Sequence, residues 1–286
     1  MAARAPEVIG GVRARAAVVG SPVSHSLSPV LHSAAYAELG LEGWTYEAVE
    51  CTEAGFPEWF AGLDPTWRGL SLTMPLKRVV LPLLHSISDL GVAVGAVNTV
   101  TWDDEGRPMG NNTDVHGIVE ALRSAGAATA GPVRSACVLG AGATACSAVA
   151  AVAELGATDV VLLARSAQRA GDALAVAGRV GVRARVVALD SWAEVVAADV
   201  VVSTLPAAPA AEWAAALPPV RPAGVLLDVT YHPWPTPTAT AWTATGAVAV
   251  GGFEMLLHQA AGQFTLATGR TAPLEAMRQA GERALA

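Results

Sequence analysis

Three small residues at fixed spacing, Gly140, Gly142 and Ala145, mark the first place where the sequence indicates chemistry. The apolar run 136–139 before them predicts a buried strand, and the residues that follow, as far as Leu155, predict a helix. In such a turn the first glycine allows a tight bend, the second lets a pyrophosphate approach the backbone, and the third small residue lets helix and strand pack closely. The helix N-terminus then faces the anion. We therefore expect a dinucleotide site here, the alternative being an ordinary strand-to-helix turn. The expected cofactor-binding residues of this turn are Gly140, Ala141, Gly142, Ala143, Thr144 and Ala145.

The end of the next expected strand, 159–164, indicates which dinucleotide binds. An acidic residue about 20 positions after the turn would bind the ribose 2′-hydroxyl of NAD. Here the strand runs instead into Arg165, Ser166 and Arg169. Guanidinium groups pair with phosphate oxygens in bidentate fashion, so this set suits a 2′-phosphate. The sequence predicts NADP rather than NAD, and a solvated loop at the start of a helix is the alternative.

Lys77 is the residue that could exchange protons, and Asp114 is a carboxylate that could pair with it. The segment 70–77 is interpreted as a strand end followed by a helix with Pro75 at its first position, which puts Lys77 in the first helical turn. The macrodipole disfavours a cation there, and a more readily deprotonated amine suits proton transfer. A surface lysine is the alternative. Asp114 precedes another expected helix, where it either caps that helix or pairs with Lys77.

Hydroxyl groups at the start of the chain could bind a carboxylate. Ser28 followed by Pro29 predicts a helix start with Ser28 as the N-cap, and the helix is expected to stop at Gly40. Capping alone would explain Ser28, but it does not explain Ser26 in the same loop. Two hydroxyls beside free backbone N–H groups make a reasonable carboxylate seat.

Two polar residues near the end of the chain are further candidates. Proline fixes the path of the loop 231–237, so Tyr231 is expected at a fixed place. Gln259 lies on an expected helix over 253–267, where an exposed position of no functional importance is the alternative.

The elements that position these residues alternate in an α/β pattern. A first strand is expected over 14–20, a second over 44–49, and a hairpin over 103–106. After the glycine turn, strands are expected near 184–188, 199–203, 224–228 and 247–250. That pattern predicts a doubly wound sheet from about 133 to 250.

Composition limits the function classes. A chain of 286 residues is long enough for two domains. The net charge of −7 argues against a general nucleic-acid binder. The widely spaced Cys51, Cys137 and Cys146 indicate free thiols in a reducing compartment, and no Cys/His spacing resembles a zinc site, so we expect no metal. No apolar stretch is typical of a membrane span, and residues 1–15 do not resemble a signal peptide. We expect a cytoplasmic protein.

Taken together, the motifs resemble the shikimate dehydrogenase family over nearly the whole chain. The N-terminal ones are Ser-His-Ser-Leu-Ser-Pro at 24–29, Leu-Thr-Met-Pro-Leu-Lys at 72–77, Gly-Ala-Val-Asn-Thr at 95–99 and Asn-Thr-Asp at 112–114. The later ones are Gly-Ala-Gly at 140–142, Asp-Val-Thr-Tyr-His-Pro at 228–233 with Thr236, and Gly-Phe-Glu-Met at 252–255 with Gln259. The resemblance implies a catalytic domain built from both chain ends, 1–113 and 252–286, and an inserted Rossmann-type NADP-binding domain, 114–251.

The resemblance also implies the roles of the site residues. The activity would be the NADP-linked interconversion of shikimate and 3-dehydroshikimate at C3, in aromatic amino acid biosynthesis, by a monomer or homodimer. Lys77 would act as acid and base, with Asp114 orienting it. The implied substrate-binding residues are Ser26, Ser28, Thr73, Asn98, Tyr231 and Gln259. The cofactor site would add Thr204, Gly252 and Met255 to the turn and the arginine segment.

Some positions depart from the family's usual pattern, and alternatives remain open. Ser71 stands where asparagine is common, Val115-His116 replaces a frequent glycine, Ala164 replaces an asparagine, and Ser-Thr-Leu-Pro at 203–206 replaces Ala-Thr-Ser. These departures concern cofactor affinity and loop geometry. A quinate or amino-shikimate dehydrogenase of the same family is the nearest alternative, and Ser28 rather than threonine mildly favours shikimate. A non-catalytic NADP-sensing regulator is another. A serine hydrolase is disfavoured because no Gly-x-Ser-x-Gly occurs.

Overall fold

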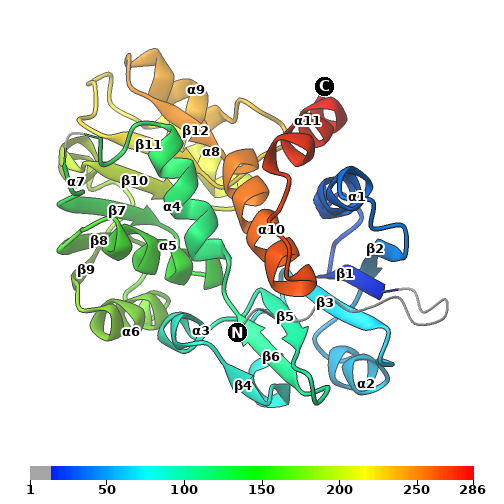
Figure 1. Ribbon diagram of the computed structural model, residues 1–286. Coiled ribbons are helices and arrows are strands. Elements are labelled where there is room, and N and C mark those ends of the chain that lie inside the picture. Colours follow the sequence, from blue (N-terminus) through cyan, green and yellow to red (C-terminus); the bar gives the residue numbers. More distant parts are fainter. Residues whose placement is uncertain (1–13, 130) are drawn as a thin grey trace. The chain divides into compact units, whose positions relative to one another are not determined.

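The computed structural model describes residues 14–129 and 131–286, so most of the N-terminal stretch that bears on a signal peptide lies outside it. The chain divides into two compact units (Figure 1). The first comprises the described residues up to Val92, Ala96–Thr113 and Leu257–Ala286, and the second comprises Ala93–Gly95 and Asp114–Leu256. The later division therefore falls inside helix α10 (Gly252–Thr268).

The first unit contains a mixed sheet in the order β2-β1-β3-β5-β6-β4. Strand β1 pairs in parallel with both β2 and β3, whereas β5 is antiparallel to β3 and β6. The strands are β1 (Ala14–Gly20), β2 (Trp44–Glu50), β3 (Trp67–Leu72), β4 (Ser86–Ile87), β5 (Thr99–Trp102) and β6 (Pro108–Asn111). The other elements, apart from α10, are α1 (Ser28–Glu38), α2 (Phe56–Ala61), η1 (Leu81–Leu83), α3 (Asp89–Val94, which crosses the division) and α11 (Leu274–Leu285).

Apolar side chains from β1, β3 and β5 form the core of the first unit, together with Phe56 and the turn residues Leu76 and Val80. Helix α1 packs against α11 and against strands β1 and β2 of this sheet. These contacts fix the carboxyl ends of β1 and β3, where several candidate site residues follow.

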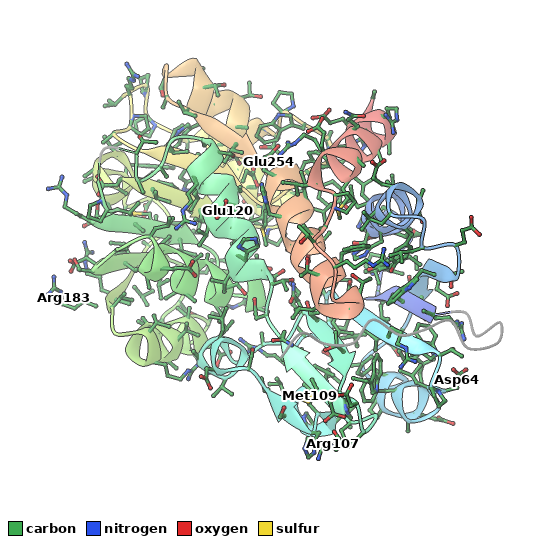
Figure 2. All side chains as sticks on the ribbon, viewed as in Figure 1. Asp64, Arg107, Met109, Glu120, Arg183 and Glu254 are labelled. Atoms are coloured by element: carbon green, nitrogen blue, oxygen red, sulfur yellow. The ribbon has the colours of Figure 1, made fainter. Side chains whose placement is uncertain are left out.

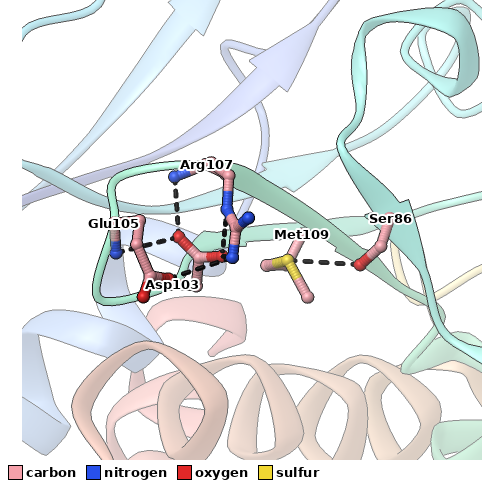
Figure 3. A network of polar contacts seen from close by, with 5 residues as sticks. All are labelled: Ser86, Asp103, Glu105, Arg107 and Met109. Atoms are coloured by element: carbon pink, nitrogen blue, oxygen red, sulfur yellow. Dashed lines mark hydrogen bonds and ion pairs between the residues drawn. The ribbon is translucent and has the colours of Figure 1, made fainter.

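The β5–β6 hairpin is closed by a polar network (Figure 3). The Asp103 carboxylate accepts hydrogen bonds from the backbone N–H groups of Glu105 and Arg107 and from the Arg107 guanidinium. Hydrogen bonds from Arg107, first its backbone N–H, hold the pKa of Asp103 below its usual range. The closed turn fixes the register in which Thr99 lies opposite Asn111, which sets the geometry of the residues just beyond both strands.

The second unit contains a fully parallel sheet in the order β12-β11-β10-β7-β8-β9. From the other edge this is the 3-2-1-4-5-6 order of the Rossmann-type doubly wound fold, which confirms the predicted fold class. The strands are β7 (Ser135–Leu139), β8 (Asp159–Leu163), β9 (Arg183–Val187), β10 (Val200–Ser203), β11 (Val225–Asp228) and β12 (Ala249–Gly251). The strand order reverses between β7 and β10, where such folds bind dinucleotides.

Two groups of helices flank this sheet (Figure 1). Helix α5 packs between α4 and α6, while α8 packs against α9. The helices are α4 (Asp114–Ser124), α5 (Ala143–Glu154), α6 (Gly171–Val180), α7 (Trp192–Ala197), α8 (Ala207–Ala215) and α9 (Pro237–Ala244). Residues of β7, β8, β10 and β11 form a buried core with Trp213 and Trp242.

The predicted helix beginning at Pro75 is wrong. Residues 74–80 form hydrogen-bonded turns, followed by the short η1. The carbonyl groups that a helix would use are bonded elsewhere: Met74 accepts from the backbone N–H of Ser21, and Lys77 accepts from that of Val97. The argument that a helix dipole acts on Lys77 therefore fails.

The prediction that Ser28 is the N-cap of α1 is also wrong. Leu27 occupies that position, and no side chain caps the helix there. Instead, the hydroxyl of Ser26 accepts a hydrogen bond from the backbone N–H of Ser28 at 3.2 Å. The polar group that satisfies the first helical N–H thus comes from two residues earlier, while Ser28 itself is buried.

An aromatic cluster fills the space between α1, β2 and α10. The His32 ring stacks on Tyr46, with ring centroids 4.1 Å apart and an interplanar angle of 12°. Tyr36 and Phe264 pack tilted beside it. Burial lowers the pKa of His32 to about 3. The imidazole is therefore neutral in the folded protein at ordinary pH.

None of the described helices is both long enough and apolar enough to cross a membrane.

Candidate active site

The glycine turn lies where the strand order of the second unit reverses. Gly140 has a φ of +112°, which disfavours any side chain, and a Cβ there would lie 2.3 Å from Thr204 Oγ1. Thr204 follows β10, and both its backbone N–H and its hydroxyl donate to the carbonyl of Leu139 at 2.8 Å. The first glycine is thus required by the close approach of β7 and β10. The Thr204 hydroxyl, predicted to bind cofactor, has a partner within this turn.

Gly142 differs from Gly140 because a Cβ added to it would meet no atom within 4 Å. The protein therefore does not itself need a glycine at this position. The first intrahelical hydrogen bond of α5 runs from the Cys146 N–H to the Gly142 carbonyl, so the N–H groups of the three residues between them precede the helical ladder. Ala145 is fully buried against the sheet. Open space in front of a helix N-terminus fits a pyrophosphate.

Arg165, Ser166 and Arg169 are exposed and follow directly after β8. Among the described residues, no carboxylate pairs with either guanidinium. Arg183, on the neighbouring strand β9, behaves differently: it donates to both oxygens of Asp159, at 2.8 and 2.7 Å, and points outward in Figure 2. Arg165 and Arg169 are therefore suited to bind an anion from outside the protein. Arg183 already has a carboxylate partner within it.

The Thr73–Lys77 segment is held by long-range backbone hydrogen bonds in the first unit. The Thr73 N–H donates to the Val19 carbonyl at the end of β1, and the Val97 N–H donates to the Lys77 carbonyl at 2.8 Å. A Cβ on Gly20 would lie 2.3 Å from Thr73 Cγ2, so only glycine permits this approach. The Leu72 N–H donates to the Asn98 carbonyl at 2.7 Å, so the segment that carries Thr73 and Lys77 lies next to Asn98.

Asn98 is the centre of a buried hydrogen-bond group that we call the Asn98 hub (Asn98, Thr99, Thr113 and Gln259). Asn98 Oδ1 accepts from the Thr113 backbone N–H at 2.7 Å and from the Thr99 hydroxyl at 2.8 Å. Its Nδ2 donates to Thr113 Oγ1 at 3.0 Å and to Gln259 Oε1 at 3.3 Å. The two ends of the hairpin and helix α10 therefore meet at one amide. Gln259 is buried, which excludes the exposed position considered as its alternative.

Glu50 braces the loop that carries Ser26. Its two carboxylate oxygens accept from the Ser21 hydroxyl at 2.5 Å and from the Val23 N–H at 3.1 Å. The Ser26 N–H donates to the Val23 carbonyl, and its hydroxyl accepts from Ser28 as described above. Each of these bonds shapes one short loop at the end of β1.

In the second unit, a single carboxylate ties both ends of the loop that carries Tyr231. Asp228 Oδ1 accepts from the Thr230 N–H at 3.2 Å, and Oδ2 accepts from the Thr236 hydroxyl at 2.7 Å. Thr236 in turn caps α9 through the Ala239 N–H. Burial raises the pKa of Asp228, opposed by these hydrogen bonds. Tyr231 is half-buried within this tethered loop.

Gly252 and Met255 begin helix α10. The Gly252 N–H donates to the Thr230 carbonyl, and a Cβ on Gly252 would lie 2.0 Å from the Val229 carbonyl oxygen. The second unit itself thus requires this glycine. Met255 is buried.

The predicted site residues divide between the two units. The first unit carries Ser26, Ser28, Thr73, Lys77, Asn98 and Gln259, while the second carries Asp114, Tyr231 and the predicted cofactor residues. Asp114 is buried and directly follows Thr113 of the Asn98 hub. No three metal-ligating side chains gather among the residues that the structure describes.

Several polar residues with hydrogen bonds inside the first unit were not identified as site residues from the sequence. Thr99 and Thr113 flank Asn98 and Asp114 in the motifs that were found, so adjacency alone could have indicated them. Gln263 lies four residues after Gln259, on the same helix face, and was missed. Tyr46 has no local signal, since its partner Ser71 is on another strand.

Comparison with known proteins places this geometry in context. Residues 18–100 match the family model for the shikimate dehydrogenase substrate binding domain, and residues 252–280 match that for the shikimate 5'-dehydrogenase C-terminal domain. Among curated proteins, shikimate dehydrogenase (NADP(+)) of Moorella thermoacetica is 35% identical over 270 residues, which cover 91% of this chain and 90% of the relative.

Solved structures agree with the sequence matches. Shikimate dehydrogenase of Mycobacterium tuberculosis has a TM-score of 0.83 and 41% identity, covering 94% of this chain and 99% of that one. The enzyme of Thermus thermophilus, in complex with NADP(H) and shikimate, has a TM-score of 0.79 and 36% identity, covering 95% of this chain and 99% of its own.

The two glycines of the turn are predicted to respond differently to substitution by alanine. Gly142→Ala keeps the stability of the free protein, because its Cβ enters open space, yet weakens NADPH binding by filling the space that a pyrophosphate needs. Gly140→Ala lowers the melting temperature as well, because of its φ and the contact with Thr204. Thermal unfolding without ligand and NADPH titration measure the two effects. Equal loss of stability in both variants would contradict this account.

Proposed function

The chain belongs to the shikimate dehydrogenase family, and from that premise we propose that it interconverts shikimate and 3-dehydroshikimate as an NADP-dependent oxidoreductase. In aromatic amino acid biosynthesis this is the redox step at C3 of the ring. The observation that carries the proposal is the arrangement in the first unit, where backbone hydrogen bonds from Val97 to Lys77 and from Leu72 to Asn98 hold the segment 72–77 beside the buried Asn98 amide.

The substrate carboxylate is assigned to the two serine hydroxyls, Ser26 and Ser28, and to Tyr231. Hydroxyl groups donate to carboxylate oxygens, and charge-assisted hydrogen bonds of this kind are stronger than neutral ones. The ring hydroxyls are assigned to Thr73, Asn98 and Gln259. The Asn98 hub supports this assignment because its bonds fix which atom of each amide donates and which accepts.

Lys77 is assigned the proton transfer. As a neutral amine it accepts the proton of the C3 hydroxyl during oxidation, and as an ammonium it returns that proton during reduction. Asp114 is assigned to orient Lys77 and to stabilise its charged form. The proton therefore moves between an amine nitrogen and the substrate oxygen, while the Asn98 hub keeps the ring in place.

The cofactor site is assigned to the glycine turn for the pyrophosphate and to Arg165, Ser166 and Arg169 for the 2′-phosphate, with Thr204, Gly252 and Met255 beside them. When bound, NADP supplies the hydride acceptor and donor for C3. The open space at Gly142 and the exposed arginines support this fit. The protein's own contribution is to bind, orient and move a proton.

The finer assignments follow from the same premise. We place the protein in the cytoplasm, as a monomer or homodimer acting on a small-molecule substrate. A quinate or amino-shikimate dehydrogenase would use the same residues, and a pocket difference of one hydroxyl or amine separates them. An NADP-sensing regulator would bind the cofactor without turnover.

Initial rates of NADP⁺ reduction at 340 nm test the proposed function. We expect turnover with shikimate and NADP⁺, and much less with quinate or with NAD⁺. A preference for quinate would assign the sister activity. Cofactor binding with no turnover of either acid would contradict the proposal and favour an amino-substituted substrate or the regulator.

Replacing Lys77 tests the assigned proton transfer. Lys77→Ala should lower kcat by about 10²-fold or more while NADPH binding persists, because removing a general acid–base group has an effect of this size. Arg78→Ala removes the adjacent, exposed cation and should keep most turnover. Near-normal turnover in Lys77→Ala would remove Lys77 from the mechanism.

The arginine pair is predicted to select NADP. Replacing both Arg165 and Arg169 with alanine should weaken NADPH binding by about 10-fold or more, since hydrogen bonds to charged groups contribute about 1.5–3 kcal/mol, and should leave NADH binding nearly unchanged. Arg183→Ala is the matched control, because its guanidinium pairs with Asp159. Equal losses for the two cofactors would reject this selection.

A further inference from the structure

A directed chain of hydrogen bonds crosses the interior of the first unit behind the proposed substrate residues. The Tyr46 hydroxyl on β2 donates to Ser71 Oγ on β3 at 2.6 Å. The Ser71 hydroxyl then donates to Gln263 Oε1 on α10 at 2.8 Å. Ser71 and Gln263 are both nearly inaccessible to solvent. The hydrogen bonds all run in the same direction, from Tyr46 through Ser71 to Gln263, so this hydrogen-bond chain has a single favourable arrangement.

This hydrogen-bond chain ends on the backbone of Asn98. Gln263 Nε2 donates to the Asn98 carbonyl oxygen at 3.2 Å, and the Leu72 N–H donates to the same oxygen at 2.7 Å. Gln259, one helical turn earlier on α10, accepts from the Asn98 side chain. Two glutamines at i and i+4 therefore hold one asparagine, one through its backbone and one through its amide.

The orientation of the Gln263 amide is fixed by its two partners. Its oxygen faces a hydroxyl donor, and its nitrogen faces a carbonyl acceptor. A rotated amide would place its oxygen against the Asn98 carbonyl oxygen and lose a buried hydrogen bond, which is costly. Ser71 is short enough to bridge Tyr46 and Gln263. The serine that departs from the family's usual asparagine thus has a specific role in this chain.

The other end of this hydrogen-bond chain is the Tyr46 phenol. Burial raises the pKa of the Tyr46 phenol, and hydrogen bonds with Ser71 and Ser28 oppose that change. The phenol therefore stays protonated and can donate to Ser71.

We propose that Gln263, held by Ser71 and Tyr46, is a positioning residue that fixes Asn98 for substrate binding. This inference rests on the proposed function, because it requires Asn98 to contact the ring hydroxyls. Gln263 itself need not touch the substrate. It aligns the backbone of Asn98 and, through the shared helix α10, the side chain of Gln259.

The test is a graded set of variants measured by steady-state kinetics: Gln263→Met, Ser71→Ala and Tyr46→Phe. We expect the KM for shikimate to rise about 3- to 10-fold in Gln263→Met, which removes the bond to Asn98, and by less in the two variants farther along the chain. The kcat and the Kd for NADPH should stay near their original values. A merely structural role would lower kcat through a smaller active fraction and leave KM unchanged.

Tyr36→Phe is the matched control, because the buried Tyr36 hydroxyl has no hydrogen-bond partner among the residues described. It makes the same chemical change as Tyr46→Phe and should leave KM unchanged. If Gln263→Met does not fold, Ser71→Ala and Tyr46→Phe carry the test by the same measure.

The outcomes separate the two proposals. Shikimate turnover with an unchanged KM in the variants that fold overturns the positioning role alone. An equal rise in Tyr36→Phe and Tyr46→Phe also overturns it, because general loosening of the core would then explain both. No shikimate turnover by the unaltered protein removes the proposed function and this inference with it.

Discussion

The arrangement of the first unit depends on how completely one buried amide is hydrogen-bonded. Asn98 Oδ1 and Nδ2 join Thr99, Thr113 and Gln259, while its carbonyl oxygen holds β3 and Gln263. A buried polar group that lost these bonds would carry its full desolvation cost. The β5–β6 hairpin, the turn after β3 and helix α10 therefore have to meet at this residue. The same requirement fixes Thr113, which directly precedes Asp114.

In the second unit the notable feature is open space, which lies at the glycine turn between β7 and α5. Gly140 permits contact between β7 and Thr204, whereas Gly142 leaves room that no protein atom occupies. Arg165 and Arg169 are exposed in the segment that follows β8. A helix N-terminus with open space already in front of it would suit an anion without rearrangement, which would reduce the ordering cost of binding.

Local patterns predicted the second unit well and the first less well. The strand–glycine–helix pattern is set by residues close in sequence, so the β7–α5 turn was predicted from it, and the alternation of strands and helices predicted the doubly wound sheet. The helix expected at Pro75 failed because the Met74 and Lys77 carbonyls bond to Ser21 and Val97, which are distant in the chain. Gln263 and Tyr46 were missed for the same reason, since their partners lie on other elements. The assigned substrate and catalytic roles rest on the family resemblance rather than on spacing.

His32, the histidine stacked on Tyr46, makes the stability of the first unit depend on pH. His32 has an ordinary pKa of 6.5 that burial lowers to about 3 in the folded protein. The unfolded chain takes up a proton as the pH falls below 6.5, while the folded chain stays neutral at this ring until about pH 3. As the pH decreases from 6.5 to about 3, the contribution of His32 to the free energy of unfolding therefore decreases by about 1.4 kcal/mol per pH unit. The aromatic packing that keeps α1 against β2 thus makes proton uptake a driving force for opening the first unit in acid.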